Sequence, residues 1–121
     1  MITPRADAKA HGAGMKVDGL LDSDIGKTAV LIDDLVTRAD SKLEAVSILT
    51  AQGLTVKDIV VLIDRKQGGR EQLAAQGLDL HAALTMDKML GFYVEVGRLS
   101  QERYQDTVDR LEALNRFFDK M

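Results

Sequence analysis

The sequence predicts an α/β fold in which a parallel sheet is flanked by helices. Short apolar runs rich in β-branched residues alternate with segments of helical periodicity, which is typical of parallel strands joined by helices. The unit from Thr28 to Ile63 reads as strand, helix and strand, and it has the roughly 30 residues or more that a right-handed parallel crossover requires. With 121 residues, the chain is long enough for one such domain and too short for two.

The first elements are short. Residues 1–5 are expected to be extended, and residues 6–15 are rich in Ala with two Gly, which is typical of a mobile loop. The β-branched run at 28–32 predicts a strand buried on both faces, which ends at Asp33 and Asp34.

The best-defined helix follows this strand. Ser41 and Glu44 have the spacing of a capping box, and Gly53 stands where a helix C-terminus needs a left-handed residue. The apolar run at 59–63 then predicts a second buried strand, which completes the strand–helix–strand unit.

The rest of the chain continues the alternation. The pattern predicts a short helix at 70–76, a third strand at 80–84, and two C-terminal helices at 86–96 and 100–120. Because we find no repeat and no internal linker, we expect residues 1–121 to form a single domain.

Composition excludes several classes of function. Sixteen Lys and Arg against nineteen Asp and Glu give a net charge of -3, so no overall field draws the chain to nucleic acid or to an anionic membrane. Without Cys there is no disulfide scaffold and no thiolate chemistry, and two His argue against a His-rich metal site. No apolar run approaches the ~20 residues of a membrane span, and the N-terminus lacks the apolar core of a signal peptide, so we expect a cytoplasmic protein.

The first candidate site is the segment between the first strand and its helix. In an open parallel sheet, ligands bind at the carboxyl ends of strands, and a helix N-terminus there attracts anions. Asp33 and Asp34 could accept hydrogen bonds from sugar hydroxyls, and the hydroxyls of Thr37 and Ser41 could donate to a phosphate. The alternative is that Ser41 only caps the helix and that both aspartates are solvated.

Two further groups of cations are candidates. Arg5, Lys9 and His11 lie on the small-residue segment near the N-terminus, where they suit a lid that closes over an anionic substrate; the alternative is an ordinary charged loop. Arg65 directly follows the second strand and is either a ligand-binding side chain or a solvated charge.

Several segments carry a resemblance by their order. They are Met1-Ile2-Thr3-Pro4-Arg5, Lys9-Ala10-His11-Gly12, Val30-Leu31-Ile32-Asp33-Asp34-Leu35-Val36-Thr37 to Ser41, Gly53-Leu54-Thr55-Val56-Lys57-Asp58, Val61-Leu62-Ile63-Asp64-Arg65-Lys66-Gln67-Gly68-Gly69 and Leu80-His81. Together they span about residues 1–90 and resemble the C-terminal part of the orotate phosphoribosyltransferase family, including the form fused to a decarboxylase as UMP synthase. The resemblance implies a partial type I phosphoribosyltransferase fold with added C-terminal helices.

The resemblance also implies a glycosyltransferase reaction of pyrimidine (UMP) biosynthesis. Ribose 5-phosphate would pass from phosphoribosyl pyrophosphate to orotate, giving orotidine 5'-monophosphate and pyrophosphate. Asp33 and Asp34 would hold the ribose hydroxyls, Asp34 also counting as catalytic, and Arg65 would contact orotate. The 5-phosphate would lie on the turn formed by Thr37, Arg38, Ala39, Asp40 and Ser41.

By the same resemblance, Arg5, Lys9 and His11 would engage the pyrophosphate, with Lys9 and His11 as catalytic residues. Magnesium would be carried by the pyrophosphate and not by a protein metal site. The family works as a dimer with exchanged loops, so we expect a homodimer in which Lys9 and His11 reach the partner subunit's site.

Four departures from the family pattern matter. Ala6 stands where the family usually has a second Lys, and Ala39 stands where the phosphate turn usually has Gly. Asp40 adds a negative charge near the expected phosphate, which Arg38 could offset. The 121 residues also lack the family's N-terminal segments. The competing hypothesis is therefore a non-catalytic, truncated module that binds phosphoribosyl compounds or serves in assembly.

Overall fold

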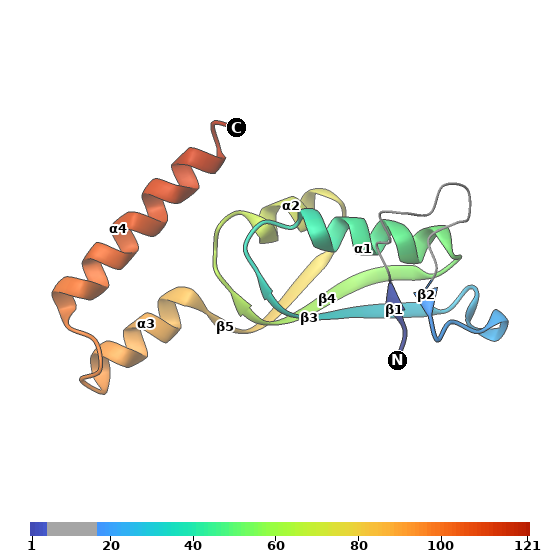
Figure 1. The fold of residues 1–121 in the computed structure, drawn as a ribbon, viewed down its shortest axis with the longest axis horizontal. Helices are drawn as coiled ribbons and strands as arrows, with labels where there is room; N and C mark the ends of the chain where they lie inside the picture. The colour runs from blue at the N-terminus through green and yellow to red at the C-terminus, as the bar shows by residue number, and fades with distance from the viewer. Residues whose placement is uncertain (5–16) are drawn as a thin grey trace.

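The computed structural model describes residues 1–4 and 17–121, which form two small sheets and a set of helices (Figure 1). Arg5, Lys9 and His11, and the loop predicted at 6–15, lie outside the described residues. The elements are β1 (Thr3–Pro4), β2 (Val17–Asp18), the 3-10 helix η1 (Asp22–Asp24), β3 (Thr28–Val36), α1 (Asp40–Ala51), β4 (Thr55–Asp64), α2 (Gly69–Ala75), β5 (Asp79–Thr85), α3 (Met86–Glu95) and α4 (Gln101–Phe118).

The main sheet is parallel, with the strand order β3-β4-β5, and this confirms the predicted fold class. Figure 1 shows α1 and α2 on one side of this sheet, while α3 and α4 extend from the end of β5. The separate pair β1-β2 is antiparallel. Each crossover carries a helix between neighbouring parallel strands, as the strand–helix–strand pattern requires.

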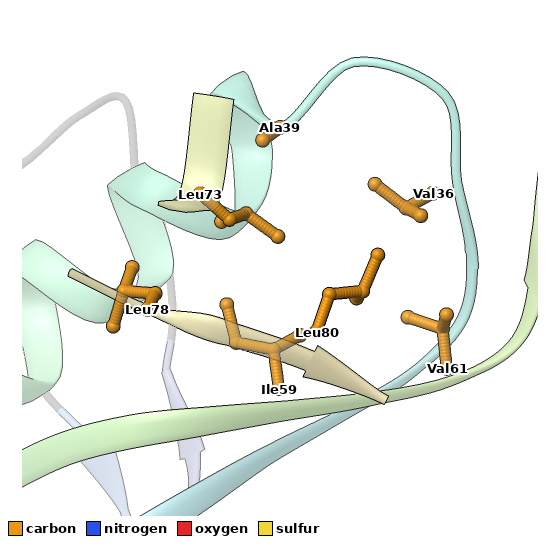
Figure 2. Close-up of a cluster of buried hydrophobic side chains, with 7 residues drawn as sticks. All are labelled: Val36, Ala39, Ile59, Val61, Leu73, Leu78 and Leu80. Carbon is orange, nitrogen blue, oxygen red and sulfur yellow. The ribbon is translucent and has the colours of Figure 1, made fainter. Parts of the chain in front are cut away.

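The core lies between the sheet and the two crossover helices (Figure 2). Its members are apolar residues on the helix-facing side of the strands and on the sheet-facing side of the helices and their turns. They are Val36, Ala39, Ile59, Val61, Leu73, Leu78 and Leu80. Full burial of each larger side chain contributes about 1.5–3 kcal/mol relative to exposure, so this cluster fixes how the strand ends meet the helices.

The prediction that the first two strands are buried on both faces is wrong for the described chain. Val30 and Ile32, which alternate with the inward-facing Leu31, are 52% and 76% exposed. On β4, Leu62 is likewise exposed beside the buried Val61. Because α1 and α2 cover only one face of the sheet, the apolar residues of the other face meet solvent in this arrangement.

The first strand is also longer than predicted. It continues through Asp33 and Asp34 to Val36, because Leu35 and Val36 remain paired with Ile63 and Asp64 of β4. The two aspartates are therefore strand residues, and the turn that leads into α1 contains only residues 37–39. The second strand, β4, likewise begins earlier than predicted, at Thr55 and not at residue 59, whereas the elements after it lie within two residues of the predicted bounds.

Within the described residues, none of the helices is long and apolar enough to span a bilayer.

Candidate functional site

The site is built where the loops after β3 and β4 are joined by backbone hydrogen bonds. The amide of Arg65 donates to the carbonyl of Val36 at 3.0 Å, and the amide of Gly69 donates to the carbonyl of Thr37 at 3.1 Å. Because Gly69 has no side chain, the chain after β4 can approach the end of β3 closely enough for this hydrogen bond. A Cβ atom there would lie 2.7 Å from Cγ2 of Val36 and 2.8 Å from the carbonyl oxygen of Thr37.

Helix α2 also holds the turn that precedes α1. Oε1 of Gln72 accepts a hydrogen bond from the amide of Ala39 at 2.8 Å, and the side chain of Ala39 is fully buried in the core. Ala39 has a φ of -96°, which any L-residue adopts without strain. The alanine, which stands where the family that the sequence resembles usually has Gly, is thus compatible with this turn.

The predicted capping box of Ser41 and Glu44 is wrong. Helix α1 begins at Asp40, so its N-cap is Ala39, two residues before Ser41, and no capping side chain accepts a hydrogen bond there. The strand extension to Val36 shortens the connection, so Ser41 falls inside the first turn. The amides of that turn have no acceptor within the helix, which is the arrangement by which helix N-termini bind anions.

The two aspartates of β3 have different environments. Oδ2 of Asp33 lies 2.7 Å from Nζ of Lys42, a lysine of the first turn of α1 that is only 7% exposed. The hydrogen bond from Lys42 is the main reason that the pKa of Asp33 lies below its usual value, although partial burial acts in the opposite direction. Asp33 therefore serves chiefly as the partner of a buried ammonium group.

Both aspartates are exposed, and Asp34 is the one without a lysine partner among the described residues. Its Oδ1 accepts the amide of Leu35 at 2.7 Å, and its own amide donates to Oδ1 of Asp33 at 2.8 Å. No ion pair joins Asp34 to a residue within 1–4 or 17–121. Its second oxygen is thus available to a ligand hydroxyl or to a cation that arrives with a ligand.

Arg38 and Asp40 do not form the ion pair that would offset the aspartate's charge. The side chain of Asp40 is exposed at the start of α1. The guanidinium of Arg38 lies against the loop after β4, where Nη1 is 3.5 Å from the carbonyl oxygen of Gln67. Thr37 is half-buried and its carbonyl accepts the amide of Gly69, while Ser41 is exposed.

The structure does not bring Arg65 to the phosphate turn. Its side chain lines a small cavity of about 100 Å³ between the end of β4 and the helices α3 and α4, together with Met86, Leu111 and Glu112. The Nε atom of Arg65 is buried without a hydrogen-bond partner in the described part of the chain. The contact of Arg65 with orotate that the resemblance implies stays a prediction.

The sequence pattern did not predict the roles of two residues at this site, Lys42 and Gln72. Lys42 pairs with Asp33, nine positions before it, at the end of β3. Gln72 accepts the amide of Ala39, 33 positions before it, in the turn. The role of Lys42 could have been predicted from its place on the inner face of the predicted helix, where a lysine needs an anionic partner. Nothing in the local pattern around Gln72 indicates its bond to Ala39.

The Asp33–Lys42 pair predicts a dependence of stability on pH. Because the folded pKa of Asp33 lies below the unfolded value, the pair stabilises the fold above about pH 4 and loses this effect as the pH falls through the folded value. We expect roughly 1 kcal/mol, since Asp33 is 45% exposed and solvent screens the pair. Urea unfolding of wild type, Asp33→Asn and Lys42→Met between pH 6 and pH 3 tests this. The prediction is contradicted if the free energy of unfolding of the wild type falls with pH no more steeply than that of the two variants.

No protein-family model matches the chain. Among curated proteins, it is 36% identical over 104 residues to the bifunctional enzyme PyrF/PyrE of Nostoc sp., covering 86% of the chain and 21% of that enzyme. It is 32% identical over 111 residues to uridine 5'-monophosphate synthase of Caenorhabditis elegans, covering 92% and 22%. It is 34% identical over 89 residues to orotate phosphoribosyltransferase of Halobacterium salinarum, covering 74% and 50%.

Solved structures give the same relationship. UMP synthase of Leishmania donovani matches with a TM-score of 0.77 and 31% identity, covering 93% of the chain and 24% of that structure. Orotate phosphoribosyltransferase of Mycobacterium tuberculosis, solved with Fe(III) dicitrate, matches with a TM-score of 0.62 and 27% identity, covering 73% and 49%. The chain spans between about a fifth and a half of the length of these relatives.

Proposed function

The chain is homologous to part of the orotate phosphoribosyltransferase family, and on that basis we propose that it acts in the transfer of ribose 5-phosphate to orotate. The donor is phosphoribosyl pyrophosphate, and the products are orotidine 5'-monophosphate and pyrophosphate, in UMP biosynthesis. The observation that supports this proposal most directly is the end of β3, where the uncapped first turn of α1 follows the exposed carboxylate of Asp34.

Each part of this strand end has a role in the proposed reaction. The amides of the first turn of α1 hold the 5-phosphate, aided by the helix dipole. Asp34 accepts hydrogen bonds from the ribose hydroxyls, and Asp33 keeps Lys42 paired beneath the turn. Departure of pyrophosphate leaves positive charge on the sugar, so orientation and charge stabilisation supply the catalysis and no protein nucleophile is needed. We propose, from the resemblance, that Arg5, Lys9 and His11 contact the pyrophosphate.

Magnesium enters this proposal as part of the substrate. The described residues contain no group of three metal-ligating side chains. The exposed oxygen of Asp34 is the type of ligand that Mg²⁺ accepts, and it lies at the strand end where the sugar would bind. Bound Mg²⁺ would neutralise charge on the pyrophosphate, while the protein residues orient the ribose.

An assay of the purified chain tests the proposed function. Incubation at high protein concentration with orotate, phosphoribosyl pyrophosphate and magnesium should release pyrophosphate and orotidine 5'-monophosphate in equal amounts. Absence of turnover at every protein concentration would reject the catalytic proposal as stated.

One observation favours a second candidate function, a module that binds phosphoribosyl compounds without turnover. The side chain of Arg65 lines the cavity beside α3 and α4, and its Nε atom is buried without a hydrogen-bond partner in the described residues. Calorimetry with ribose 5-phosphate, combined with the pyrophosphate assay on phosphoribosyl pyrophosphate, orotate and magnesium, decides between the two. Binding in the first experiment without pyrophosphate release in the second supports the module, and binding together with release supports the transferase.

The charge of Asp40 gives a prediction for the same experiment. Its carboxylate stands at the first residue of α1, where it opposes the negative charge of a bound phosphate monoanion. Asp40→Asn should therefore bind ribose 5-phosphate about fivefold more tightly, because removal of one like charge a few ångströms away is worth about 1 kcal/mol in water. Glu44→Gln, one turn further along α1, is the matched control and should change the affinity less.

We also propose a homodimer that acts in the cytoplasm. Strand β3 is an edge strand of the described sheet, and its apolar residues Val30 and Ile32 are exposed beside that edge. Burial of such a strand by a second copy would remove a site of uncontrolled pairing. Light scattering should give twice the chain mass of 13.3 kDa. Ile32→Lys should dissociate the dimer and Phe92→Lys on α3 should not, whereas a wild-type monomer would contradict the proposal.

A further inference from the structure

The guanidinium of Arg38 occupies a seat formed by two segments that are distant in sequence. On one side, its Cζ atom lies 5.8 Å from the ring centroid of Phe118, the last residue of α4. On the other side it lies over Gly68, where a Cβ atom would be only 2.8 Å from Nη1. The carbonyl of Gln67 lies 3.5 Å from the same nitrogen. We call these three residues the Arg38 seat.

The last turns of α4 are fixed near this seat by a second contact. Nδ2 of Asn115 donates to the carbonyl of Lys66 at 3.3 Å. Asn115 and Arg38 also line one cavity of about 550 Å³, whose wall continues through Gln72 of α2. The end of α4 therefore contacts the loop after β4 and the turn before α1 at the same time.

Arg38 and Lys42 are the two cations next to the proposed phosphate site, and Lys42 is already paired with Asp33 at 2.7 Å. Arg38 precedes the N-cap residue Ala39, so its side chain starts from the turn itself. No carboxylate within the described residues forms an ion pair with it. A guanidinium prefers a phosphate, with which it can make two charge-assisted hydrogen bonds, to the face of an aromatic ring.

We propose that Phe118 withholds Arg38 from the phosphate turn, so that the end of α4 sets the affinity of this turn for phosphate. This inference rests on the proposed function. A phosphate that recruits Arg38 must first displace it from the seat, and a cation–π contact at a partly exposed site weakens such binding by about two- to fivefold. Movement of α4 away from the turn would release the guanidinium.

Calorimetry of ribose 5-phosphate binding tests the proposal with matched variants. Phe118→Leu keeps an apolar side chain but removes the aromatic face, and it should bind two- to fivefold more tightly than wild type. Phe118→Tyr keeps the aromatic face and should bind as wild type does. Phe117→Leu removes the neighbouring ring, which is 60% exposed, and it should also leave the affinity unchanged.

A second substitution identifies Arg38 as the cause. Arg38→Met should weaken binding, and Phe118→Leu should have no further effect in that background. Equal affinity of wild type and Phe118→Leu, or an equal gain in Phe117→Leu, would overturn the proposal.

An NMR measurement separates this proposal from the proposed function. The Nε–H proton of Arg38 should show an aromatic ring-current shift that disappears in Phe118→Leu and persists in Phe118→Tyr. A shift that is absent in wild type overturns the seat itself. If the shift is present but none of the variants binds ribose 5-phosphate, the proposed function fails, and the control of affinity by Phe118 fails with it.

Discussion

Gly69→Ala should lower the free energy of unfolding by about 3 kcal/mol, the upper end of what an extra methyl group costs in a well-packed core. The new Cβ atom would lie 2.7 Å from Cγ2 of Val36 and 2.8 Å from the carbonyl oxygen of Thr37. Val36 is fully buried, so its side chain has no free space to enter. The carbonyl belongs to the backbone and accepts the amide of Gly69 itself, so it can move only if this hydrogen bond is broken.

The same substitution should also weaken ribose 5-phosphate binding. The methyl group would force Thr37 away from α2, and this movement changes the turn that places Ala39 against Gln72. The first-turn amides of α1 follow that turn directly. Calorimetry under conditions where the variant remains folded would separate this loss from the loss of stability.

Gly91→Ala is the matched control. Gly91 lies within α3, and a Cβ atom there meets no atom within 4 Å. Alanine is favoured over glycine in a helix interior, so this variant should gain about 0.5–1 kcal/mol. Urea unfolding of both variants measures the two effects. A loss in Gly69→Ala no larger than the change in Gly91→Ala would show that the strand end tolerates a side chain.

The backbone pairing explains why the first strand was predicted too short. Its apolar run ends at Ile32, and two aspartates are unusual inside a parallel strand. The strand continues because Leu35 and Val36 pair with β4, and this pairing depends on main-chain atoms that leave no side-chain pattern. The same extension moved the helix start to Asp40, so the error in the strand produced the error in the capping box.

Apolar character alone predicts that Val30 and Ile32 are covered by other parts of the chain. A β-branched run indicates that a strand has two apolar faces, but it does not indicate what packs on each face. In the site, the sequence order of carboxylates, turn and helix predicts the order in which the structure places them at the end of β3, while anion binding there stays a prediction. Which aspartate is free could not be predicted, because the partner of Asp33 is the distant Lys42.

This difference between the two aspartates leads to the second large effect. Asp34→Asn should weaken binding of ribose 5-phosphate by about 10- to 100-fold, since each hydrogen bond to an ionised carboxylate is worth about 1.5–3 kcal/mol. Asp34 is exposed and has one oxygen without a partner in the described chain, so the substitution removes ligand contacts and little else. Its stability should remain within about 0.5 kcal/mol of wild type, as for most surface changes.

Asp33→Asn should show the reverse pattern. Its carboxylate is held 2.7 Å from the buried ammonium of Lys42, and loss of that charge leaves the lysine without an anionic partner. Removal of one member of a buried pair is costly, and solvent access to Asp33 reduces that cost here to about 1–2 kcal/mol. Asp33→Asn combined with Lys42→Met should recover most of it, because the unpaired charge is then absent. If Asp33→Asn weakens ligand binding as strongly as Asp34→Asn while leaving stability unchanged, both carboxylates contact the sugar, and the division of roles between them is wrong.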